Sequence, residues 1–101
     1  MQWDIYVYQL KNNKLNLIYT EADIGANQGV FSNDKKRLAY WPRNTGGLCI
    51  LDLKTKKRSV YRFSLDPQGR GDCSAWSRND KSIYIAYVMR DDTKYYVISN
   101  L

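Results

Sequence analysis

Few side chains in this sequence have the type and spacing that chemistry requires. The chain of 101 residues contains no histidine, which removes the commonest general base and a frequent metal ligand. Cys49 and Cys73 are 24 positions apart and neither belongs to a CxxC pair, so the usual zinc and redox spacings are missing. The acidic pair Asp91 and Asp92 lacks the alternating oxygen ligands of a calcium loop. We therefore expect no catalytic residue, no metal site and no cofactor, and we predict that the protein is not an enzyme.

The two cysteines are predicted to be ordinary core residues. Buried thiols behave as small apolar side chains and suit a strand-rich chain. A disulfide between Cys49 and Cys73 is the alternative, and it would require an oxidising compartment. Both alternatives stay open at the level of sequence, and the cellular location stays open with them.

One segment with the composition of a recognition loop lies at 41 to 47. It places Trp41 and Arg43 beside two glycines, and aromatic and arginine side chains are enriched where proteins bind partners. The same segment also reads as a plain connection between strands, in which Pro42 and the glycines set the bend. Trp41 and Arg43 are therefore candidate partner-binding residues, with the structural role as the alternative.

A second candidate loop lies at 64 to 72. It ends in Arg70-Gly71-Asp72, which matches the integrin-binding tripeptide, although three residues make a weak motif. Asp72 has an equally simple role as a turn-capping residue before the next strand. Arg70 and Asp72, together with Arg90 from a later loop, complete the set of candidate partner-binding residues.

These candidates must be positioned by strands, because the sequence contains an internal β repeat. FSNDKKRLAY at 31 to 40 and WSRNDKSIYI at 76 to 85 align at a constant offset of 45, with Phe31 matching Trp76. A second element recurs as IYVYQLK at 5 to 11, LCILDLK at 48 to 54 and YYVISNL at 95 to 101. The offsets are 43 and about 47, as expected when loops vary in length and strands keep their register.

Further strands are predicted at LNLIYT (15 to 20) and RSVYRF (58 to 63), each after a Lys/Asn-rich turn. Short strands between turn signals, with no helical period, favour antiparallel sheets. If the four strands of a repeat unit are called A to D, the chain runs C, D, then A, B, C, D, then A, B, C. The fold class is therefore predicted to be all-β.

The repeated hairpins resemble the TolB-type repeat, a WD40-like β-propeller family whose consensus hairpin reads Trp-Ser-Pro-Asp-Gly-Lys. In this chain Asn33 and Arg78 replace the turn proline, and Lys35 and Asp80 replace the glycine, so the copies are degenerate. The resemblance implies antiparallel four-stranded blades and an incomplete propeller of somewhat more than two blades. The whole chain, 1–101, would form one unit: a partial blade at 1–20, a complete blade at 27–63 and a partial blade at 73–101.

The same resemblance implies a noncatalytic protein-interaction module. Propellers of this family bind envelope proteins in the periplasm, whereas from this sequence itself we expect neither a signal peptide nor a membrane span. Its open ends suggest a protein partner or a second copy that completes the blades. The alternative is part of the propeller that caps prolyl-oligopeptidase-like serine hydrolases.

Charge separates the two predicted loop faces. On the face of the A–B and C–D turns, eleven basic residues oppose Asp34 and Asp80, a net charge of +9; these are Lys11, Lys14, Lys35, Lys36, Arg37, Lys54, Lys56, Lys57, Arg58, Arg78 and Lys81. The opposite face has a net charge of −3. The basic face suggests an anionic partner, but lysine is also common in solvated turns, and no aromatic platform accompanies it. We therefore expect no nucleic-acid partner.

Overall fold

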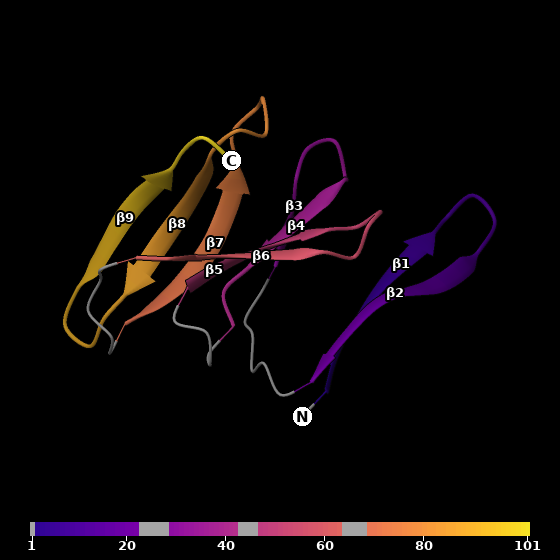
Figure 1. Cartoon of the computed structure of the whole chain (residues 1–101), viewed down its shortest axis with the longest axis horizontal. Helices are drawn as coiled ribbons and strands as arrows, with labels where there is room; N and C mark the ends of the chain where they lie inside the picture. The colour runs from indigo at the N-terminus through magenta and orange to yellow at the C-terminus, as the bar shows by residue number, and fades with distance from the viewer. Residues whose placement is uncertain (1, 23–28, 43–46, 64–68) are drawn as a thin grey trace.

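The computed structural model describes residues 2–22, 29–42, 47–63 and 69–101, and these form three antiparallel sheets arranged along the longest axis of the molecule (Figure 1). Every paired strand runs antiparallel to its neighbour, so the all-β prediction is confirmed. None of the described residues forms a helix that could cross a membrane.

The nine strands of the described residues follow the predicted grouping of two, four and three. The N-terminal hairpin contains β1 (Gln2–Gln9) and β2 (Lys14–Ala22). The central sheet contains β3 (Val30–Phe31), β4 (Arg37–Tyr40), β5 (Gly47–Asp52) and β6 (Arg58–Arg62). The C-terminal sheet contains β7 (Arg70–Trp76), β8 (Ile83–Val88) and β9 (Thr93–Ile98). In each sheet the spatial order equals the chain order, so every connection within a sheet joins neighbouring strands.

A serine-based turn joins β3 to β4. The hydroxyl of Ser32 donates to Asp34 Oδ1 at 2.7 Å and accepts from the backbone N–H of Arg37 at 3.0 Å. Lys35 has a left-handed φ of 63°, a conformation that glycine adopts without strain. Lysine therefore occupies a position whose backbone conformation glycine would adopt more easily.

The turn between β7 and β8 repeats this arrangement 45 residues later. Ser77 donates to Asn79 Oδ1 at 2.8 Å and accepts from the N–H of Ser82 at 3.0 Å, while Asp80 has a φ of 59°. The sequence repeat therefore corresponds to a repeated turn with the same hydrogen bonds, not only to similar residue types.

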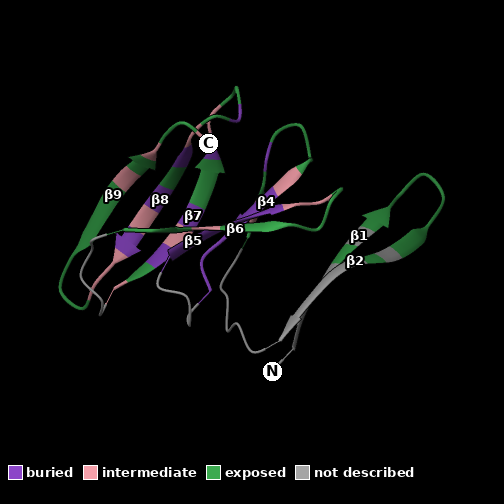
Figure 2. Cartoon of the chain, viewed as in Figure 1, coloured by how far each residue is buried: buried purple, intermediate pink, exposed green. Residues whose placement is uncertain are grey.

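The core lies on both sides of the central sheet, whose strands β4 and β5 are largely buried (Figure 2). Alternate residues of β4 and β5 point to opposite faces. Ala39, Leu48 and Ile50 join the C-terminal sheet in one buried cluster with Ile83 and Ile85. The intervening residues form a second cluster on the other side, which consists of Leu38, Tyr40, Cys49 and Leu51. The central sheet is thus apolar on both faces.

The central and C-terminal sheets are held together through Trp76. Its indole N–H donates to the carbonyl oxygen of Val30 at 2.9 Å, and the guanidinium of Arg37 lies 4.5 Å from the centre of its ring. Arg37 also donates to the carbonyl oxygens of Asp80 and Leu101. This seam joins segments that are more than 40 residues apart, so it fixes how the two sheets pack.

Candidate interaction surfaces

Metal-ligating and nucleophilic side chains can be compared with the sequence analysis within residues 2–22, 29–42, 47–63 and 69–101. No three His, Cys, Asp or Glu side chains in these ranges gather where they could hold a metal ion. Cys49 and Cys73 are both buried, and neither takes part in a disulfide, which agrees with their prediction as core thiols. Burial raises the pKa of Cys73 to about 12, with a smaller contribution from Asp72, so this thiol is not an activated nucleophile.

Trp41 follows directly after β4 and is only 6% exposed. Its ring stacks on Phe63 at a centroid distance of 6.2 Å and meets the ring of Tyr87 edge to face at 5.8 Å. A side chain at Gly71 would lie 2.3 Å from the indole, so the ring is pressed against the backbone of β7. This packing favours the structural interpretation of Trp41, because a partner cannot reach most of the ring.

The other four candidates have different positions. Arg43 lies outside the described residues. Arg70 and Asp72 belong to β7, where they pair with Val88 and Ala86, so their expected placement in a loop was wrong. The loop reading failed because Gly71 fits a strand here, where it makes room for the indole of Trp41.

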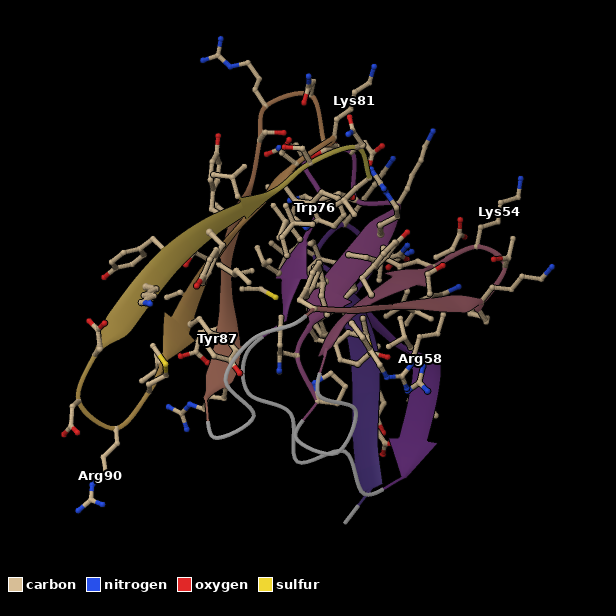
Figure 3. All side chains as sticks on the ribbon, turned by 60° about the vertical axis from the view of Figure 1, so that its left-hand side comes forward. Lys54, Arg58, Trp76, Lys81, Tyr87 and Arg90 are labelled. Atoms are coloured by element: carbon tan, nitrogen blue, oxygen red, sulfur yellow. The ribbon has the colours of Figure 1, made fainter. Side chains whose placement is uncertain are left out.

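Arg90 lies in the exposed turn between β8 and β9 and points away from the sheet (Figure 3). Arg70 is exposed at the first position of β7, whose partner strand β8 ends just before this turn. The two arginines therefore belong to the same end of the C-terminal sheet. The binding roles of all five candidates remain predictions.

The basic turns lie on the side of the molecule opposite to the turn that carries Arg90. The turns from β1 to β2, β3 to β4 and β7 to β8 point to the same side in Figure 1, and the turn from β8 to β9 points away from it. In Figure 3 Lys81, from the turn between β7 and β8, and Lys54, from the turn between β5 and β6, extend away from the sheets, far from Arg90. The described lysines in these turns are exposed, as expected for solvated hairpin turns.

A feature that the sequence analysis did not single out is the outer edge of β9. In the central sheet the equivalent strand, β5, pairs with β6 on this side, but β9 is the last strand of its sheet in the described residues. Beside the edge lies a hollow of about 410 Å³, whose lining consists of Phe63, Ile85, Tyr96, Val97, Ile98, Ser99 and Asn100. The missed signal was the run Tyr-Tyr-Val-Ile at 95–98, which presents apolar side chains to both faces of an edge strand.

The edge of β9 is less protected against pairing with further strands than β6, the corresponding edge strand of the central sheet. Strand β6 carries Arg58 and Arg62 among five residues, and charged side chains discourage pairing with further strands. Strand β9 carries one charged residue, Lys94, among six. The hollow and the weakly charged edge together make β9 the best candidate surface for an added strand.

The chain has no significant match to any protein-family model, any curated protein or any solved structure.

Proposed function

We propose that the protein is a noncatalytic protein-interaction module of propeller-type blades, and that it binds an extended segment of a partner at β9. The observation that carries this proposal is the open edge of β9 beside an apolar hollow. Adding a strand to a sheet edge supplies main-chain hydrogen bonds, while pockets for alternate side chains provide selectivity. The 45-residue repeat and its matched serine turns support the assignment of the sheets as blades.

The central sheet indicates how the partner segment would align. Ala39 pairs with Ile50, and the repeat-equivalent Tyr84 pairs with Val97, so β5 and β9 correspond at an offset of 47. Strand β6 pairs with β5 in the register Gly47 with Arg62 and Cys49 with Val60. We assume that an added strand pairs with β9 as β6 pairs with β5. Its residue equivalent to Arg62 would then lie opposite Lys94, and its residue equivalent to Val60 would lie opposite Tyr96.

This register defines the chemistry of the preferred segment. The residue opposite Tyr96 should be apolar, because it would enter the hollow beside Phe63. The residue opposite Ile98 should be apolar for the same reason. The residue opposite Lys94 should be acidic, because opposite charges on facing strands attract. We therefore expect an extended segment with the pattern apolar, any, apolar, any, acidic.

A peptide built from β6 tests this proposal. The probe has the sequence of residues 58–63 with Arg58→Ile and Arg62→Glu, which gives the expected pattern. Amide hydrogen exchange of β9 should slow when the peptide is added, because strand pairing protects backbone N–H groups. The matched control peptide carries Val60→Asp in addition and should give no protection, because a carboxylate would enter the apolar hollow.

A charge exchange tests the alignment itself. Lys94→Glu in the protein should reverse the preference, so that the peptide that keeps Arg62 binds better than the one with Arg62→Glu. If saturating peptide leaves the exchange of β9 unchanged, the proposed strand addition is wrong. If binding occurs without reversal by Lys94→Glu, the register is wrong.

A further inference from the structure

We infer that two copies of this chain associate head to tail, through an apolar face at each end of the row of sheets. The inference goes beyond the proposed function, because it concerns the flat faces of the end sheets and not the edge of β9. Figure 1 shows the N-terminal hairpin and the C-terminal sheet at opposite ends of the molecule, with the central sheet between them.

The first face is the outer side of the C-terminal sheet and consists of Tyr84, Tyr95 and Val97. Tyr84 and Val97 are directly paired across β8 and β9, and Tyr95 is two residues from Val97, so the three side chains share one face. They are between 45% and 80% exposed. Three large apolar side chains without a cover form the kind of patch that marks an interaction surface.

The central sheet shows what covers this face in the preceding repeat. The positions equivalent to Tyr84, Tyr95 and Val97 are, in the same order, Ala39, Leu48 and Ile50. These equivalents are at most 6% exposed, because the C-terminal sheet packs on them. The same face of two repeat-related sheets is thus buried by another sheet in one case and open in the other.

The second face lies on the N-terminal hairpin and consists of Tyr6, Tyr8, Leu15 and Leu17. Tyr6 pairs with Leu17 and Tyr8 with Leu15, so the four side chains project from one side of the hairpin. They are between 49% and 61% exposed. Tyr6 and Tyr8 are the repeat equivalents of Cys49 and Leu51, which lie on the side of the central sheet that turns away from the C-terminal sheet.

The two exposed faces are equivalent to the two faces that pack together between the central and C-terminal sheets. We call the side of the central sheet that carries Ala39, Leu48 and Ile50 its forward face, and the opposite side its backward face. The faces of the other sheets are named by their repeat-equivalent residues. Within the chain, the forward face of the central sheet packs against the backward face of the C-terminal sheet. The open face of the C-terminal sheet is a forward face, and the open face of the N-terminal hairpin is a backward face. A second copy therefore offers the surface that continues the internal packing, and contact between unlike faces makes the association heterologous.

Two copies placed in this way would give six sheets. Closed propellers have about four to eight blades, so a ring of two copies falls within the range in which such stacks close. Closure would cover both apolar faces of each copy, while a single contact would leave one face of each copy open. The expected species is a closed dimer with two identical contacts.

Sedimentation equilibrium at micromolar concentration tests the inference with two variants. One carries Tyr84→Lys and Tyr95→Lys, and the other carries Tyr8→Lys and Leu17→Lys. The wild-type protein should sediment at twice the 11.9 kDa chain mass, and each variant alone at the chain mass. An equimolar mixture should return toward twice the chain mass, because each variant retains the face that the other lacks. Leu10→Lys, in an exposed turn outside both faces, is the matched control and should leave the wild-type mass unchanged.

Each other result overturns the inference. A wild-type protein at the chain mass rules out self-association, and a variant that stays at twice the chain mass shows contact between like faces. A mixture that remains at the chain mass rules out complementary faces, and threonine at the same four positions repeats the test if a lysine pair unfolds the chain. Binding of the β6-derived peptide is measured on the variant with Tyr8→Lys and Leu17→Lys, which leaves β9 unchanged. Failure of self-association is thereby distinguished from failure of strand addition.

Discussion

The carboxylate of Asp80 accepts hydrogen bonds from both the backbone N–H of Asn33, at 2.7 Å, and its side-chain amide, at 2.9 Å. The second oxygen accepts from the N–H of Asp34 at 3.0 Å. Asp80 belongs to the turn of the C-terminal sheet, and Asn33 to the equivalent turn of the central sheet. Lys35 occupies the repeat position of Asp80 in the earlier turn, so one unusual turn residue supplies a link between the two repeats in addition to the contacts of Trp76 and Arg37.

This link makes the stability of the protein depend on pH. Burial raises the pKa of Asp80, but the hydrogen bonds from Asn33 and Asp34 outweigh it and hold the pKa below its ordinary value of 3.8. The unfolded chain therefore binds this proton more tightly than the folded protein does. The stability that the link provides should be complete above pH 3.8 and should be lost as the pH falls through the lower, folded pKa.

Chemical denaturation of the wild-type protein and of Asp80→Asn across this range measures the effect. The amide keeps the size of the side chain but cannot titrate, so the difference in stability between the two proteins should shrink as the medium becomes acidic. Asp34 and Asp52 also have lowered pKa values, but both remain in the two proteins, so Asp80 is the one titrating group that the substitution removes. A difference that stays constant with pH would contradict the assigned role.

Glycine substitution at the two repeat positions should have opposite effects. Lys35 and Asp80 have left-handed φ values of 63° and 59°, and such a conformation costs a non-glycine residue about 1 kcal/mol or more. Lys35→Gly should relieve this strain and stabilise the protein by about 1 kcal/mol, less the greater chain entropy of glycine when unfolded. Asp80→Gly gives the same relief but removes the link to Asn33, so its melting temperature should fall. Equal shifts in the two variants would mean that the link contributes nothing.

Gly71→Ala should destabilise the protein by about 2 kcal/mol, since overpacking of a buried site typically costs this much. A β-carbon at this position would lie 2.3 Å from the ring of Trp41, which is itself enclosed by Phe63 and Tyr87. Arg70→Ala, one position earlier and exposed, is the control and should change the free energy of unfolding little. Thermal melts of both variants provide the comparison, and a neutral Gly71→Ala would contradict the packing described for Trp41.

Thiol labelling should report on unfolding. Cys49 and Cys73 are buried, and the pKa of Cys73 is raised to about 12 mainly by burial. Neither thiol should react with a water-soluble reagent in the folded protein, whereas both should react fully in denaturant. Mass spectrometry after brief labelling at neutral pH checks this. Rapid labelling of Cys73 under native conditions would show that the seam between the sheets opens.

The sequence predicted the strands well because the repeat carries two independent signals. Turn residues recur at an offset of 45, and apolar residues alternate in the strands between them, so local chemistry alone places each hairpin. The placement of Arg70 and Asp72 failed because a glycine between two charged residues resembles a turn. Only the position of Trp41 across the seam explains why Gly71 lies in a strand.

The candidate surfaces were harder to predict, for a physical reason. Whether an apolar side chain is buried depends on which sheet lies against it, and Leu48 and Tyr95 occupy equivalent positions with opposite exposure. The residue types of the two strands do not show which position is buried, because Leu48 and Tyr95 both lie in an apolar strand of the same repeat element. The candidate recognition role of Trp41 was inferred from its residue type and the neighbouring glycines, and neither shows that the ring packs against Phe63 and Tyr87.

The order of the strands has a consequence for how this protein folds. Every strand pairs with its neighbour in the chain, so each hairpin can form locally and within microseconds, without a search over long loops. The contacts of Trp76, Arg37 and Asp80 join segments more than 40 residues apart, so they close much longer loops than the hairpins do and are expected to form later. The docking of preformed sheets would then be the rate-limiting step, and substitutions along the seam should slow refolding more than substitutions in the outer turns.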